Sequence, residues 1–265
     1  MARIIRKGYQ LEEEYYAIKQ EQADKRAKNI RTLGKVTFAF FMIYIVSIAV
    51  SVVTSIFSSV FVPLSACFVV VQVIAVFVCL GGGVSKYVDT DILVSGIHGE
   101  RFAAKVLAIL PDDYIVFQNV KVTFDNKQSE IDNIVVGKSG VFIIEVKNHN
   151  SHIVGDLKDT YWIQHKVGRG GTPYTNQVYN PVKQVGTHIY CLANYLRQNG
   201  VNVYIEGMVY FVNKTCVLSL TGDSNISVYS RSNCEEKLLF GQILSGNYNL
   251  DSRSINRICK LINQL

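Results

Sequence analysis

The sequence predicts an α/β domain with a mixed central sheet flanked by helices, preceded by a hairpin of two transmembrane helices. Three observations lead to this prediction. A long uncharged apolar run lies in the first third of the chain, from Val36 to Ser85. After it, apolar residues recur with strand spacing in some segments and with helical spacing in others. One of these helices, beginning at Pro181, connects two strand segments, which favours an α/β sandwich around a mixed sheet.

The apolar run is long enough for two membrane spans. No Asp, Glu, Lys, Arg or His occurs between Val36 and Ser85, and one span needs about 20 apolar residues. We place the spans near 36–57 and 60–80, with a turn around Pro63. A cleaved signal peptide is disfavoured, because 35 mostly polar residues precede the run.

Basic residues set the expected orientation. Nine Lys and Arg residues precede Val36, whereas the turn between the spans has none, and an excess of Lys and Arg marks the cytoplasmic side of a membrane. We therefore expect an integral membrane protein whose termini and globular domain are cytoplasmic and whose hairpin contacts the lipid bilayer. The predicted parts are a basic juxtamembrane segment (1–35), the two helices (36–80), a linker (81–94) and a globular domain (95–265).

Charge and cysteine content exclude some classes of protein. The formal net charge is +6, and most of it belongs to the first 35 residues. The globular part is therefore not strongly basic, and its charge alone does not predict nucleic-acid binding. The six cysteines include no CxxC pair and no Cys/His cluster, which disfavours a zinc site or a disulfide scaffold.

The residues with the clearest chemistry lie in a predicted β-hairpin, residues 130–147. Its turn is the sequence Gly-Lys-Ser-Gly at 137–140, which is typical of a hairpin. If these four residues form the loop, Asp132 lies opposite Glu145, with Cβ atoms about 5 Å apart. Side chains alternate along a strand, so Glu145 and Lys147 share one face. Two carboxylates and an ammonium group are therefore expected to converge.

Carboxylates in apolar strands require a partner. One interpretation is a structural ion pair beside an exposed glutamate. The interpretation that we favour is a divalent metal site, because paired carboxylates repel without a cation and their oxygens suit Mg²⁺ or Mn²⁺. The neighbouring ammonium would orient the attacking water or stabilise charge on phosphorus. The reaction class that follows is metal-assisted phosphodiester hydrolysis.

Two helices supply further candidates. In the predicted helix 96–110, Glu100 lies on the apolar stripe, although a first-turn glutamate favoured by the helix dipole explains its position equally well. Asn180 and Pro181 are a typical N-cap and first helical residue, and Gln184 flanks the buried stripe of the helix that they begin. Both Glu100 and Gln184 are therefore placed where they can reach a neighbouring site.

The remaining segments are predicted from composition and periodicity. Residues 148–180 form a polar, glycine-containing insertion, in which Trp162 is interpreted as a packing residue and His152 and His165 as isolated histidines. Strands are predicted at 114–117, 120–124, 153–154, 161–164, 208–212, 216–220 and 226–229, and further helices at 234–244 and 252–264.

Four sequence blocks, in this order, resemble the nuclease-related domain, NERD. They are GIHGE at 96–100, EID at 130–132, GVFIIEVKN at 140–148, and Asn180-Pro181 with Gln184. That domain is grouped with the PD-(D/E)XK restriction-endonuclease-like superfamily. Each motif alone is weak, whereas the ordered set at these spacings is fairly specific.

This resemblance implies a restriction-endonuclease-like αβββαβ core. It also implies that Asp132 and Glu145, with the backbone carbonyl of Val146, hold Mg²⁺, and that Lys147 lies near the attacking water. The sequence departs from the superfamily pattern at Ile131, where proline commonly precedes the aspartate.

The same resemblance implies that Glu100 and Gln184 join the site from their two helices. The expected function is a membrane-anchored, metal-dependent nuclease that hydrolyses phosphodiester bonds of DNA or RNA on the cytoplasmic face, with DNA favoured over RNA and with Mg²⁺ or Mn²⁺ as cofactor. The alternative is a non-catalytic, membrane-tethered scaffold with a nuclease-like fold that binds nucleic acid or protein. The weak basicity of the globular part motivates this alternative.

Overall fold

The computed structural model describes residues 1–54, 90–168, 170–246 and 248–265. The chain divides into two compact units. One consists of Met1–Glu12 together with Asp91–Leu265, and the other of Glu13–Thr90. The first unit contains the predicted globular domain.

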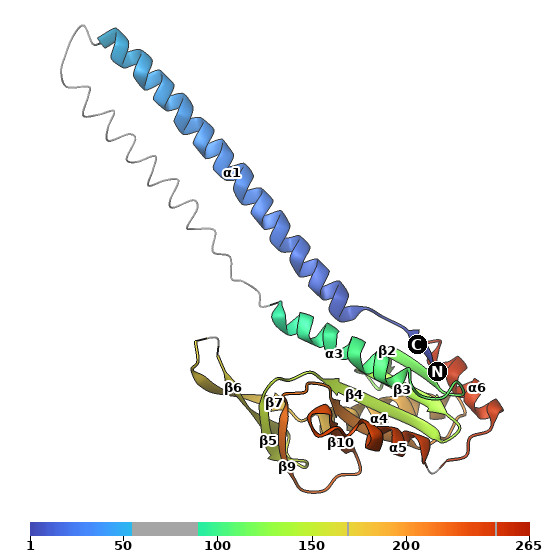
Figure 1. Ribbon diagram of the computed structural model, residues 1–265. Helices are drawn as coiled ribbons and strands as arrows, with labels where there is room; N and C mark the ends of the chain where they lie inside the picture. The colour runs from blue at the N-terminus through green and yellow to red at the C-terminus, as the bar shows by residue number, and fades with distance from the viewer. Residues whose placement is uncertain (55–89, 169, 247) are drawn as a thin grey trace. The chain divides into compact units, whose positions relative to one another are not determined.

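A six-stranded mixed sheet forms the centre of the first unit (Figure 1), in the order β1-β2-β3-β4-β8-β10. Strands β2, β3 and β4 form an antiparallel meander, whereas β8 runs parallel to β4. Along the chain, α3, β2, β3, β4, α4 and β8 reproduce the predicted αβββαβ core. The strands are β1 (Arg3–Arg6), β2 (Ile115–Phe124), β3 (Lys127–Gly137), β4 (Gly140–Lys147), β8 (Ile205–Phe211) and β10 (Ser227–Ser230).

Helices cover both faces of this sheet, because the inner strands are apolar on both sides. Helices α4 (Pro181–Gln198) and α6 (Ser252–Ile262) pack on one face, where they share a buried core with Ile143 of β4. Helices α3 (Asp91–Leu107) and α5 (Glu236–Leu244) pack on the other face with Ile144. A single turn of 3₁₀ helix, Arg231–Asn233, precedes α5. The predicted helices are thus present, with small shifts at their ends.

The segment predicted to be a polar insertion forms most of a second sheet, in the order β7-β6-β5-β9. Trp162 of β6 is fully buried in the core, as expected for a packing residue, and its indole N–H donates to the carbonyl of Asp156 at 2.8 Å. Polar residues at the inward positions that follow Trp162, namely Gln164 and Lys166, concealed the length of β6 in the sequence. The strands are β5 (His152–Asp156), β6 (Tyr161–Val167), β7 (Pro173–Tyr179) and β9 (Val217–Thr221).

The segment predicted to be a basic juxtamembrane region, residues 1–35, divides between a strand and a helix. Residues Arg3–Arg6 form β1, which pairs in parallel with β2 and thereby satisfies hydrogen-bonding groups at that sheet edge. Helix α1 begins only at Gln10 and continues to Thr54. The side chain of Glu12 accepts hydrogen bonds from Arg101 of α3 at 2.8 and 3.1 Å. The first twelve residues therefore complete the globular unit.

Among the residues that the structure describes, one helix is long and apolar enough to cross a membrane. It spans Gln10–Val46, with a mean hydropathy of 1.3 in its most apolar window. Helix α1 takes in most of the first predicted span, 36–57, and runs unbroken from the charged segment into it. The second predicted span, 60–80, lies outside the described residues.

Candidate active site

The predicted hairpin register is correct. Val136 pairs with Val141, and the ladder continues to Asn133 opposite Ile144. The next step in this register places Asp132 beside the end of β4, where its Oδ2 accepts a hydrogen bond from the backbone N–H of Val146 at 2.8 Å. This contact fixes the aspartate against the strand that carries the second carboxylate.

Strand β4 presents Glu145 and Lys147 on the same side, as side-chain alternation predicts. The Lys147 ammonium donates to Glu145 Oε1 at 2.6 Å and to Gln184 Oε1 of α4 at 3.1 Å. Gln184 holds its place on the first turns of α4 because the Asn180 side chain caps that helix, accepting from the N–H of Val182 at 2.9 Å. The lysine is thus held from two directions.

Helix α3 brings Glu100 to the cavity that contains Asp132, Glu145 and Lys147. Its Oε2 accepts a hydrogen bond at 3.1 Å from the amide of Asn119, a residue at φ 54° that interrupts β2. Burial raises the pKa of Glu100, and the charges of Glu12 and Glu130 add to the rise.

All five candidate residues line one cavity of about 320 Å³. Glu130 and Asn148 also line it, although periodicity alone did not single them out. The cavity is lined by Leu11, Gly96, Gly99, Glu100, Glu130, Asp132, Glu145, Val146, Lys147, Asn148 and Gln184.

The two central carboxyl groups have opposite electrostatic tendencies. Burial raises the pKa of Asp132 well above its ordinary value, and the charge of Glu145 raises it further. Burial also opposes the ionisation of Glu145, but Lys147 and a hydrogen bond from His188 outweigh it and lower its pKa. The pKa of Lys147 is raised, since its two carboxylate neighbours overcome the effect of burial. Glu145 and Lys147 are therefore charged, and Asp132 holds its proton more readily.

Sequence reasoning missed His188, a buried residue of α4. Its Nε2 lies 3.1 Å from Glu145 Oε2, and its Nδ1 is hydrogen-bonded to the Ser129 hydroxyl. An ionised carboxylate only accepts, so Nε2 carries the hydrogen. His188 follows Gln184 by four residues, which places both on one helical face. That spacing was present in the sequence and could have identified it.

The donor set fits a hard divalent cation. Asp132, Glu145 and the carbonyl of Val146 supply oxygen ligands, and Mg²⁺ commonly keeps several waters beside one or two carboxylates. A carboxyl group with a raised pKa next to a second carboxylate is an arrangement that a cation relieves. Within residues 1–54, 90–168, 170–246 and 248–265, no group of three or more His, Cys, Asp or Glu side chains is placed to hold a metal. A cation held here would therefore also need the backbone carbonyl and waters as ligands.

Comparison with known proteins agrees with this geometry. The family model described as the nuclease-related domain, NERD, matches residues 95–212. Residues 95–212 are thus similar to a nuclease-related domain. An uncharacterized protein of Bacillus anthracis is 37% identical to the chain over 93 residues, which are 34% of this chain and 42% of that protein. The match thus spans less than half of that relative. No solved structure matches the chain.

The boundaries of the NERD domain include every candidate residue of the site. They begin within α3, before Glu100, and end just after β8. Strand β1 and the helices after β8 lie outside the match, although they belong to the same compact unit.

Proposed function

We propose that this protein is a membrane-anchored, divalent-metal-dependent nuclease that hydrolyses phosphodiester bonds, DNA in preference to RNA. The observation that carries the proposal is the convergence of Asp132, Glu145 and Lys147 in one cavity inside a NERD domain. Two carboxylates suit a Mg²⁺ or Mn²⁺ ion, and an ammonium group beside them suits a phosphate.

The chain's own residues position the reacting groups. When bound by Asp132, Glu145 and the Val146 carbonyl, a divalent cation would polarise a phosphoryl oxygen and lower the pKa of a bound water. Lys147, held by Gln184 and Glu145, orients the attacking water and stabilises the negative charge that develops on phosphorus.

Glu145 is itself held by His188. The imidazole fixes one oxygen of the carboxylate, and the Ser129 hydroxyl fixes the imidazole in turn. Hydrogen bonds of this kind orient metal-binding groups and commonly change metal affinity by about 10- to 100-fold when they are removed. We therefore assign His188 a positioning role.

The membrane anchor is supported by the topology of the globular unit. Met1–Glu12 and Asp91–Leu265 belong to one compact unit, so the intervening segment begins and ends on the same side of any bilayer. A segment that crosses must cross an even number of times, as two spans do. The basic residues before Val36 favour a cytoplasmic location for the unit.

Cleavage assays on the full chain in detergent test the proposal. Wild-type protein and Lys147→Met are incubated with single- and double-stranded DNA and RNA, in Mg²⁺, Mn²⁺ or EDTA. Metal-dependent cleavage by the wild type, strongly reduced in the variant, is expected. Binding of nucleic acid without any cleavage, equal in both proteins, would instead establish the non-catalytic scaffold.

A further inference from the structure

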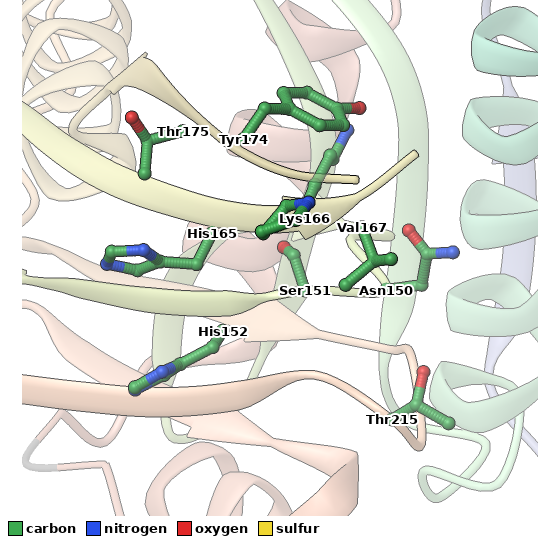
Figure 2. Close-up of a pocket in the computed structure, with 10 residues that line it drawn as sticks. Asn150, Ser151, His152, His165, Lys166, Val167, Tyr174, Thr175 and Thr215 are labelled. Carbon is green, nitrogen blue, oxygen red and sulfur yellow. The ribbon is translucent and has the colours of Figure 1, made fainter. Parts of the chain in front are cut away.

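A second hollow lies on the sheet formed by β5, β6, β7 and β9. It has a volume of about 680 Å³ and is separate from the cavity that contains Asp132. Figure 2 shows His152 and His165 on neighbouring strands, with Lys166 and Tyr174 further along the hairpin. The two imidazole rings have centroids 5.6 Å apart, so the residues interpreted as isolated histidines lie together. We call this hollow the β6–β7 groove.

The β6–β7 groove is joined to the candidate active site by a short stretch of chain. Ser151, in its wall, follows Lys147 by four residues, which span at most about 14 Å when extended. The buried side chain of Gln164 reinforces this link, because its amide contacts His149 Nδ1 at 3.1 Å and Ser151 Oγ at 2.9 Å. A polymer that reaches Lys147 therefore has the groove within its reach.

Two lysines flank the connecting histidine. Burial lowers the pKa of His149 to about 4, and the charges of Lys147 and Lys166 both contribute. His149 is thus neutral near pH 7, and the charges of both lysines reach it. Two cations that act on one residue of the connecting stretch suit a ligand that carries repeated negative charges.

The composition of the groove also points to such a ligand. The described residues that line it include no Asp or Glu, and Lys166 is the lysine among them. Tyr174 pairs with Lys166 across the β6–β7 ladder, and 44% of its surface is exposed. An exposed ring beside a cation is the arrangement on which unpaired bases stack. In a duplex the faces of the bases are covered, so only an unpaired strand can use the tyrosine in this way.

We infer that the β6–β7 groove binds an unpaired nucleic-acid strand next to the bond that is cut, with Lys166 on a backbone phosphate and Tyr174 stacked on a base. This inference rests on the proposed nuclease function and adds to it a substrate class. His165 is adjacent to Lys166 on β6 and therefore projects from the opposite face of the sheet, beside His152, so the two imidazoles are not part of the proposed contacts.

Binding measurements on the full chain in detergent test the groove separately from catalysis. The probe is a fluorescein-labelled oligodeoxythymidine strand, and anisotropy gives its Kd in EDTA over a series of salt concentrations. We expect Lys166→Gln to weaken binding about fivefold and to reduce the slope of log K against log salt by about 0.7, the value for one phosphate contact on a single strand. Lys158→Gln, at the exposed turn between β5 and β6, is the matched control and should change neither value.

Variants of Tyr174 provide a second test in the same binding assay. Tyr174→Ala should weaken binding at least about fivefold, whereas Tyr174→Phe keeps the ring and should bind like the wild type. Trp162, the single tryptophan, is buried in the same sheet, so unchanged emission verifies that each variant is folded. A duplex probe should bind more weakly than the single strand.

Three outcomes would overturn the inference. The first is an equal Kd for wild type and Lys166→Gln, and the second is an equal loss of affinity in Lys158→Gln and Lys166→Gln. The third is tighter binding of the duplex than of the single strand. The outcome for catalysis is distinct. If the wild type cleaves nucleic acid while the groove variants keep its Kd and KM, the groove assignment fails and the nuclease stands. If groove variants lose binding but no protein cleaves, the groove stands and the nuclease fails.

Discussion

Replacing Asp132 by Asn tests two effects of its carboxylate: destabilisation of the metal-free protein and binding of a metal ion. In metal-free protein, Asp132 lies next to the ionised Glu145, and its raised pKa reflects burial and that neighbouring charge. Two unit charges about 5 Å apart repel by about 3 kcal/mol at an effective dielectric constant of 20. Since Lys147 offsets much of this, we expect Asp132→Asn to stabilise the metal-free protein by about 1 kcal/mol. That is a rise in Tm of about 2–4 °C for a unit of this size.

The stabilisation expected from Asp132→Asn increases with pH. A carboxyl group whose native pKa is raised contributes stability that is fully present below its unfolded pKa, about 3.9, and is lost as pH rises through the native value. Asp132→Asn should therefore match the wild type at low pH and exceed it increasingly as pH rises. Thermal unfolding in EDTA, followed by Trp162 emission, measures both curves.

A bound metal ion should make the wild type more stable than Asp132→Asn. At 100 times its Kd, a ligand of the native state stabilises it by about 2.7 kcal/mol, which raises Tm by roughly 5–10 °C. The wild type should gain this in Mg²⁺ or Mn²⁺, and Asp132→Asn should not. Asp132→Ala is the control, because it also removes the acceptor of the Val146 N–H and should cost about 1–3 kcal/mol. If Asn destabilises the metal-free protein as much as Ala does, or if Mg²⁺ leaves the wild-type Tm unchanged, the electrostatic reasoning is wrong.

Four further changes test other parts of the structure. Lys147→Met should slow single-turnover cleavage by about 10²- to 10³-fold while keeping the metal-induced rise in Tm; loss of that rise would assign the lysine to metal binding instead. His188→Ala should weaken Mn²⁺ binding about 10- to 100-fold by calorimetry, and His188→Gln, which keeps a donor, should restore part of it. Gly207→Ala places a Cβ 2.4 Å from a valine methyl group of α4 and should cost about 1–3 kcal/mol in urea unfolding, whereas Gly186→Ala, in open space, should cost nothing. Deleting residues 1–8 should lower Tm and promote aggregation on gel filtration, because it exposes the edge of β2.

The parts of the fold that were predicted are those encoded by neighbouring residues. The Gly-Lys-Ser-Gly turn and the alternation around it determined the pairing of β3 with β4, and so placed Asp132 near Glu145 before any coordinates. The N-cap of α4 likewise follows from Asn180 and Pro181 alone. Both depend on interactions within a few residues.

What was missed depends on contacts between distant segments. Strand β1 has only four residues, and they pair with the segment of β2 that begins at Ile115. No local sequence pattern indicates that pairing. The end of β6 was missed because its inward positions after Trp162 are the polar residues Gln164 and Lys166, which break the apolar alternation. Strand β7 was missed because nearly all of its residues are exposed. His188 was passed over because its buried partners, Glu145 and Ser129, come from two strands far away in the sequence.

The pairing of β1 also affects how the chain is assembled during synthesis. Arg3 pairs with Ile115, and at about 5–20 residues per second roughly 6–20 seconds separate the translation of the two. During that time this short strand has no neighbour, and the arginines at its two ends keep it soluble and discourage pairing with other chains. The sheet is completed only when the ribosome has finished the apolar run from Val36 to Ser85, so the membrane insertion proposed above would precede completion of the globular unit.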